Sequence, residues 1–142
     1  MDHSSAATQV AVDPRHISYA NVVYVLHGLS IFIGLLSTKY IVTSFLFGVP
    51  SLIAVVMNYA RRDLVRGTWL DSHFRWQIRT FWIALIAYLV VSLLFRPLSW
   101  IWIGLPLLWM GYGLIGLWAL YRTARGWLAL REGRIMPAGG LW

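Results

Sequence analysis

The 142-residue chain has no cysteine, a single lysine and only five acidic residues, and charged residues make up 12% of it. The absence of cysteine excludes disulfides, thiolate metal sites and cysteine nucleophiles. A soluble domain normally carries about a quarter charged residues. A chain this short, with 59% hydrophobic residues and a mean hydropathy of +0.66, could not hide its apolar surface from water. The composition therefore predicts an integral membrane protein.

Four long apolar segments predict the fold class, an all-α integral membrane bundle of four transmembrane helices. A helix of about 20 apolar residues crosses roughly 30 Å of hydrocarbon. Pro50 and Pro106 lie inside the second and fourth segments, where each is expected to kink its helix. A re-entrant start to the second segment is the alternative. The expected spans are residues 18–37, 41–60, 79–95 and 98–121.

The third helix is expected to be longer than the membrane is thick. Thr68-Trp69-Leu70-Asp71 has the pattern of a capping box, which predicts a helix from Trp69 to about Phe95. At 1.5 Å per residue this is roughly 40 Å, so its first turns should lie outside the hydrocarbon. We therefore expect a basic interfacial helical extension at residues 61–78. The basic continuation of the fourth span predicts a second extension at residues 122–134.

These expectations divide the chain into three parts. Residues 1–17 are expected to form a flexible cytoplasmic tail, because they are polar and weakly patterned. Residues 18–121 form the four-helix transmembrane domain. Residues 122–142 form a basic amphipathic cytoplasmic extension, whose end at 137–140 is expected to be loose.

The basic residues are distributed unevenly between the two sides of the expected bundle. Nine arginines lie in residues 61–79 and 122–134, and Arg15 adds a tenth, whereas the other side holds only Lys39 and Arg96. Basic residues collect on the cytoplasmic side of membrane proteins. The pattern predicts that both termini face the cytoplasm, and it explains the net charge of +7 without a nucleic-acid partner.

Three polar residues stand inside or beside the expected spans. His27 is the one ionisable residue near the centre of a span, so it is a candidate ligand or proton relay. The alternative is a hydrogen bond between helices. Asn21 and Asn58 are expected to make hydrogen bonds between helices or to cap helix ends. The four histidines lack metal-ligand spacing, so neither a metal nor another cofactor is expected.

Residues 111–116 match the G-x-G-x-x-G pattern of dinucleotide-binding proteins. That fingerprint needs a preceding strand and a βαβ unit, and neither fits inside an apolar span. Small residues in such a span, like the pair Ser30 and Gly34, instead favour close packing of another helix.

The densest charge cluster precedes the third span and is the predicted binding surface. Arg75 and Arg79 are i,i+4 neighbours, as are Asp71 and Arg75, and such neighbours share a helical face. This face suits anionic lipid headgroups or an acidic partner protein; its simplest alternative role is to set orientation. The residues assigned to partner or lipid binding are His73, Arg75, Arg79, Arg61, Arg62 and Arg66.

The segment from Asn58 to Trp82, with its central His-Phe-Arg-Trp-Gln run at residues 73–77, resembles a bacterial membrane family of unknown function. Tyr121-Arg122, Gly126-Trp127 and Glu132-Gly133-Arg134 extend the resemblance, which covers about residues 20–136. The family consists of small four-span inner-membrane proteins and is distantly grouped with the chloroplast inner-envelope preprotein translocon component. The resemblance implies the same fold and the bacterial inner membrane. It supplies no catalytic residues.

The leading functional hypothesis is a non-enzymatic accessory or assembly subunit that binds protein or anionic-lipid partners. The second is a small homo-oligomeric channel or transporter, with His27 and the second and fourth spans lining the path. An enzyme acting within the membrane is the third. It has the least support, because the sequence offers no paired carboxylates, Ser-His-Asp set or activated nucleophile at usable spacing.

Overall fold

The computed structural model describes residues 12–36 and 41–139, and within them every regular element is helical, which confirms the all-α prediction. Three stretches are long and apolar enough to cross a membrane, Pro14–Gly34, Trp69–Ile101 and Gly104–Arg131, as expected of a multi-pass membrane protein. The elements in chain order are α1 (Pro14–Leu36), α2 (Ile41–Phe47), α3 (Val49–Arg61), η1 (Arg62–Val65), α4 (Trp69–Phe95), η2 (Pro97–Ile101) and α5 (Gly104–Arg131).

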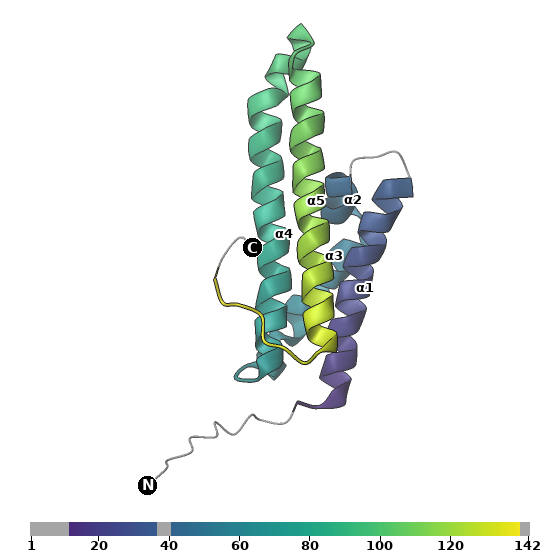
Figure 1. The fold of residues 1–142 in the computed structure, drawn as a ribbon, viewed down its shortest axis with the longest axis vertical. Helices are drawn as coiled ribbons and strands as arrows, with labels where there is room; N and C mark the ends of the chain where they lie inside the picture. The colour runs from purple at the N-terminus through teal and green to yellow at the C-terminus, as the bar shows by residue number, and fades with distance from the viewer. Residues whose placement is uncertain (1–11, 37–40, 140–142) are drawn as a thin grey trace.

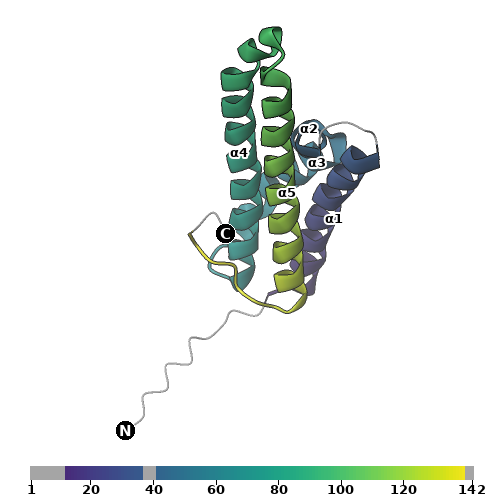
Figure 2. The ribbon, with the colours of Figure 1, turned by 45° about the horizontal axis from the view of Figure 1, so that its top comes forward.

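The two longest helices, α4 and α5, form an antiparallel hairpin whose tip is the short helix η2 (Figure 1). Helices α1, α2 and α3 pack beside one half of this hairpin, so its tip extends beyond them (Figure 2). The molecule is therefore a bundle of several helices at one end and a two-helix hairpin at the other. Lys39 and the rest of the connection between α1 and α2 lie outside the described residues.

The second apolar segment is broken, and this is where the structure departs most from the expected spans. Gly48 has an extended backbone, with φ −68° and ψ 136°, and separates α2 from α3. At 1.5 Å per residue, α2 and α3 are about 10 and 20 Å long, so neither crosses a membrane alone. Pro50 lies in the first turn of α3, where the missing N–H costs nothing, rather than at a kink.

Two other helix starts also differ from the predicted ones. Helix α1 begins at Pro14, inside the expected tail of residues 1–17, of which residues 1–11 lie outside the described residues. The Asp13 carboxylate accepts the N–H of Arg15 and caps the first turn of α1. Helix α5 begins at Gly104, so Pro106 lies in its first turn and kinks nothing. The tip that precedes it is tightly turned, and Trp102 takes a left-handed backbone conformation with φ 64°.

Helix α4 runs from Trp69 to Phe95, as the sequence predicts. The predicted capping box, however, is absent. The Thr68 hydroxyl donates to the carbonyl of Val65 at 2.7 Å instead of accepting an N–H of its own helix. The helix start is therefore fixed by the turn before it, and Gly67 in that turn has a φ of 77°, which favours glycine.

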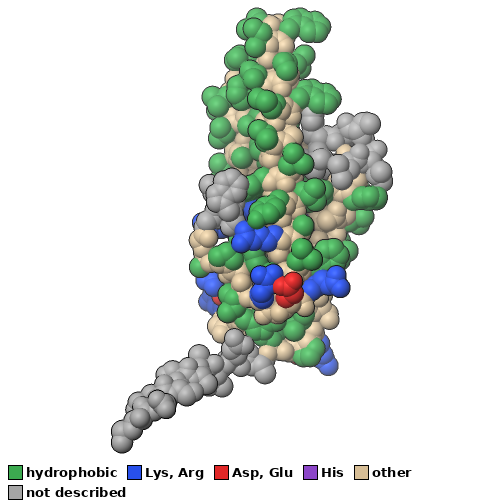
Figure 3. Space-filling model, viewed as in Figure 1, with side chains coloured by type: hydrophobic (Ala, Val, Ile, Leu, Met, Phe, Trp, Pro, Cys, Tyr) green, Lys and Arg blue, Asp and Glu red, His purple; other side chains and the backbone are tan. Residues whose placement is uncertain are grey.

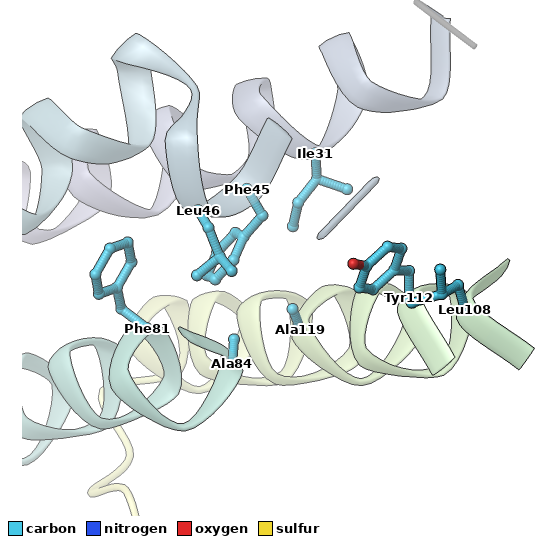
Figure 4. Packing of buried hydrophobic residues seen from close by; sticks show 8 residues of the cluster. All are labelled: Ile31, Phe45, Leu46, Phe81, Ala84, Leu108, Tyr112 and Ala119. Carbon is cyan, nitrogen blue, oxygen red and sulfur yellow. The ribbon is translucent and has the colours of Figure 1, made fainter. Parts of the chain in front are cut away.

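The apolar core joins the α4–α5 hairpin to α1 and α2. Phe45 and Leu46 of α2 point toward Phe81 and Ala84 of α4, and Ala119 of α5 completes this layer (Figure 4). Small residues allow the close approach of α5 to its neighbours. A methyl group at Gly111 would meet Val91 of α4, and one at Gly126 would lie 2.5 Å from the Tyr24 hydroxyl of α1. The G-x-G-x-x-G pattern therefore lies inside a packed helix, and not in a phosphate loop.

Among the described residues, the arginines gather at the bundle end of the molecule, except Arg96, which lies at the hairpin tip before η2. Helices α1 and α4 begin there, and α3 and α5 end there (Figure 1). Figure 3 shows the arginine side chains in that half, while the hairpin beyond it is covered by apolar groups. In that hairpin, Leu93, Trp100 and Trp102 are 78%, 90% and 81% exposed. This separation of charge and apolar surface suits a membrane protein whose basic end lies in water and whose apolar helices lie in lipid.

Candidate functional site

A groove of about 650 Å³ opens at the basic end of the molecule. Small-molecule sites typically measure about 300–1,000 Å³. Three segments form its walls: the turn that follows α3, the first turns of α4, and the chain that follows α5. The lining residues are Arg62, Arg66, Gly67, Asp71, Ser72, Phe74, Arg75, Trp76, Ile78, Arg79, Met136, Pro137 and Ala138. We call this site the basic groove.

Four of the six residues that the sequence assigns to partner binding line this groove. Arg75 and Arg79 come from one face of α4, and Arg62 and Arg66 come from η1 and the turn after it. All four are exposed. Arg61 is also exposed but does not line the groove; its guanidinium lies 4.7 Å from the centre of the Tyr19 ring. The structure thus brings together arginines that are up to 17 positions apart in the sequence.

Two aspartates neutralise part of this charge. Asp71 pairs with Arg75 at 3.3 Å, which confirms the expected i,i+4 contact. Asp63, which does not line the groove, pairs with Arg66 at 3.1 Å and lies 3.7 Å from Arg62. The Asp63 pairs are exposed on both sides, and exposed pairs contribute about 0–1 kcal/mol each, whereas the Asp71 side chain is only 19% exposed. The groove is left with four arginines and one acidic lining residue, so it attracts anions.

The chain after α5 forms the third wall, and hydrogen bonds attach it to α4. Gly133 has a φ of 64°, and its N–H and that of Arg134 donate to the carbonyls of Leu130 and Ala129, which ends α5 in a Schellman motif. The chain then turns back along α4. We call residues 134–138 the C-terminal strap. In the segment 137–140, which is expected to be loose, the Ala138 carbonyl accepts a hydrogen bond from Arg79, and residue 140 lies outside the described residues.

Three hydrogen bonds hold the C-terminal strap against α4. The ring Nε2 of His73 bonds the carbonyl of Arg134 at 2.8 Å, and the Ser72 hydroxyl accepts the N–H of Met136 at 3.0 Å. The guanidinium of Arg79 donates to the carbonyl of Ala138 at 2.9 Å. The Met136 side chain is buried. Arg79 therefore both lines the groove and holds its wall.

His73 does not share the exposed face of Arg75 and Arg79, so this part of the predicted binding surface is wrong. Its side chain is fully buried. A carbonyl can only accept, so Nε2 of His73 carries the proton, and in the neutral ring Nδ1 accepts from the Tyr24 hydroxyl at 3.1 Å. His73 thus connects α1, α4 and the C-terminal strap, and contributes to the groove only by positioning its wall.

Arg122 corrects a second expectation. The sequence places it on a basic surface extension, but its side chain is fully buried. Its Nε donates to the Thr80 hydroxyl at 2.9 Å, and its guanidinium carbon lies 3.5 Å from the ring centre of Trp76 and 5.0 Å from that of Trp118. No sequence signal separates Arg122 from its exposed neighbours, except that it follows a long apolar run at a helical spacing from Trp118.

His27 lies at the break between α2 and α3. Its Nδ1 lies 2.7 Å from the Ser51 hydroxyl, and the Ser30 hydroxyl accepts the N–H of Ser51 at 2.9 Å. Ser30 thereby satisfies a donor in the first turn of α3 that Gly48, lacking a side chain, cannot reach. His27 therefore makes the expected hydrogen bond between helices, and its Nε2 has no hydrogen-bond partner among the described residues.

The two asparagines behave differently. Asn21 accepts the indole N–H of Trp127 at 3.1 Å and donates to the carbonyl of Ile17, so it connects α1 with α5 as expected. Asn58 is fully buried, and its side chain has no hydrogen-bond partner among the described residues. The expected hydrogen bond of Asn58 is therefore not observed.

Beside His27 lies a void of about 10 Å³, which is enough for roughly one water molecule. Tyr24, Thr80 and Arg122 also line it. Within residues 12–36 and 41–139, no three His, Asp or Glu side chains come together as metal ligands would. The basic groove is therefore the candidate site that the geometry favours.

Comparison with protein-family models, with curated proteins and with solved structures finds no match for this chain.

Proposed function

We propose that this chain is a non-enzymatic membrane protein, an accessory or assembly subunit that binds anionic lipids or acidic partner proteins through its basic end. One observation carries the proposal: four arginines from two separate segments line a single groove of about 650 Å³. An orientation signal alone needs positive charge on the right side of the membrane, but it needs no shaped site.

The membrane arrangement belongs to the same proposal. We take α1, the broken pair α2–α3, α4 and α5 as four spans of a bacterial inner-membrane protein related to the four-span family. The basic ends of the helices lie together, which supports placing both termini in the cytoplasm. In this arrangement the first two turns of α4 and the last turns of α5 project from the hydrocarbon as the basic extensions.

The test is purification of the full chain in mild detergent, followed by identification of the lipids and proteins that remain bound. The matched variant replaces Arg61, Arg62, Arg66, Arg75 and Arg79 with glutamine. We expect the wild-type chain to retain anionic lipid or a foreign protein, and the variant to lose it. Equal retention by both chains would contradict the proposal and leave these arginines with orientation only.

A second candidate, a homo-oligomeric channel or transporter, is favoured by the break at Gly48. Discontinuous helices often form transport sites, and His27 and Ser51 lie beside the break. The void there has room for roughly one water molecule, so within one chain it offers space for a proton relay but not for a permeation path. Proton or ion flux into liposomes, abolished by His27→Gln but retained by Arg131→Gln, would favour this candidate over the first.

A further inference from the structure

We propose that the basic groove binds one anionic glycerophospholipid, with its phosphate among Arg75, Arg79 and Arg62. This inference rests on the proposed function and narrows it. The C-terminal strap forms one wall of the site, so the lipid would be held by three separate segments of the chain. Arginine suits this ligand because its planar guanidinium donates two parallel hydrogen bonds to phosphate oxygens.

The composition of the groove favours a lipid over an ion. Alongside the arginines, its lining includes Phe74, Ile78, Met136 and Pro137. A free inorganic anion gains nothing from such apolar walls, whereas the glycerol and first acyl carbons of a phospholipid do. A volume of about 650 Å³ is also far larger than a bare phosphate needs.

The position of the groove along α4 favours a lipid over a soluble acidic peptide. Arg79 is the last charged residue of α4 before the apolar run that continues to Phe95. At the next turn on the same face, the Trp82 indole donates to the Tyr59 hydroxyl at 2.8 Å, and both side chains are exposed. Exposed tryptophan and tyrosine mark the headgroup level of a membrane. The groove therefore lies at or just outside that level, where a phosphate would be found.

The aspartates beside the groove neutralise only part of its positive charge. Asp71 faces Arg75 from the same helix, and Asp63 faces Arg62 and Arg66. Arg79 donates one N–H to the carbonyl of Ala138. Because this carbonyl is neutral, the hydrogen bond does not neutralise the positive charge of Arg79. A guanidinium has five N–H donors. A phosphodiester placed beside Arg79 would therefore meet positive charge that the two aspartates do not neutralise.

Two variants test the site by independent means. Arg75→Gln with Arg79→Gln removes two positive charges from the groove. Ala138→Trp fills the groove and leaves every charge in place, because Ala138 is exposed and Arg79 contacts only its backbone carbonyl. The matched control is Arg125→Gln with Arg131→Gln, which removes the same charge from α5 outside the groove. Unfolding midpoints confirm that each variant is folded.

The measurement is native mass spectrometry of the full chain, exchanged from detergent with phosphatidylglycerol or phosphatidylcholine. Short-chain phosphatidylglycerol and inorganic phosphate serve as competitors. We expect one phosphatidylglycerol per chain, displaced by the short-chain lipid and not by equimolar phosphate. Binding should fall about 30-fold in the double-arginine variant, fall clearly in Ala138→Trp, and change little in the control. If the double-arginine variant unfolds, the loss of phosphatidylglycerol binding in Ala138→Trp alone serves as the test.

Several results would overturn the inference. Equal losses in the groove variants and the control would mean diffuse attraction, which leaves the proposed function standing. Displacement by phosphate as readily as by the short-chain lipid would identify a free-anion site. If the groove variants kept the lipid but lost a co-purifying protein, the groove would be a protein-docking site. If the wild-type chain retained neither lipid nor partner, the proposed function would fail as well.

Discussion

The guanidinium carbon of Arg122 lies 3.5 Å from the ring centre of Trp76, and the Trp76 indole N–H donates to the carbonyl of Arg122 at 3.1 Å. A cation–π contact and a hydrogen bond therefore both connect these two residues across the α4–α5 interface. A cation over a buried tryptophan contributes about 2 kcal/mol or more when it is desolvated. This pair lies behind the basic groove, because Trp76 lines the groove and Arg122 does not.

Arg122→Lys should destabilise the protein by at least about 2 kcal/mol, because an ammonium cannot stack on Trp76 and also reach the Thr80 hydroxyl as a planar fork does. Arg131→Lys, on the exposed end of α5, should have almost no effect. Thermal unfolding in detergent measures both. Equal midpoints for the two variants would show that the stacking of Arg122 contributes nothing.

Gly126→Ala should destabilise the bundle by about 1–3 kcal/mol, because the new methyl group would lie 2.5 Å from the Tyr24 hydroxyl and push α1 from α5. Gly113→Ala is the matched control. It has open space around the new methyl group and should be neutral or gain up to about 1 kcal/mol from helix propensity. Chemical unfolding of the two variants distinguishes close packing from a general intolerance of α5 to alanine.

Ser72→Ala should loosen the C-terminal strap, because the N–H of Met136 would lose its acceptor. A lost hydrogen bond of this kind costs about 1 kcal/mol, which corresponds to roughly a fivefold larger open population. Limited trypsin cleavage after Arg134 should accelerate by a similar factor. Ser18→Ala, on an exposed position of α1, should leave the rate unchanged; a rate that is also unchanged in Ser72→Ala would show that the strap is held without this bond.

Replacing Arg75 and Arg79 by glutamine should weaken association with anionic headgroups by about 2 kcal/mol at low salt, since each basic residue near an anionic leaflet contributes about 1 kcal/mol. The loss should shrink as salt rises, because screening acts over about 8–10 Å. Replacement by lysine separates two mechanisms: it retains binding if the contact is a point charge and loses it if the contact is a bidentate fork. Titration of nanodisc-embedded protein at two salt concentrations measures each case.

A reporter fused after Gly67 should report the cytoplasm, and one fused after Ser99 the opposite side. Gly67 lies in the exposed turn at the basic end, and Ser99 lies in η2 at the hairpin tip. The two fusions should report opposite sides because arginines accumulate at the end that contains Gly67, and basic ends face the cytoplasm. If the fusion at Gly67 reported the opposite side, the proposed orientation would be wrong.

Residues that share one helix were well predicted from the sequence. The bounds of α4 match the prediction, although the capping box that predicted its start is absent, and the Asp71–Arg75 pair follows from i,i+4 spacing. These features depend on neighbours within a few positions. The accumulation of basic residues at one end also follows from the sequence, because alternating helix directions bring distant helix ends together.

The positions of the two prolines could not be predicted from local sequence alone. Pro50 and Pro106 were expected to kink continuous helices, yet each lies in a first turn. Proline fits both a kink and a helix start, so the pattern alone cannot choose between them. Contacts with other segments decide between the two. Ser30 of α1 accepts the N–H of Ser51 in the first turn of α3. At the start of α5, a side chain at Gly104 would clash with the backbone of Leu98 and Phe95.

The sequence by itself determined that this chain is helical, apolar enough for a membrane, and basic at one end, because composition and helical period need no partner. Only the tertiary structure decided which basic residues are available. Arg75 and Arg79 remain exposed beside the groove, whereas Arg122 is buried against Trp76 and His73 against Tyr24. The physical reason is that a charged or polar side chain can be buried only where other helices supply hydrogen-bond acceptors and aromatic faces. The sequence pattern of one helix does not show which other helix will supply them.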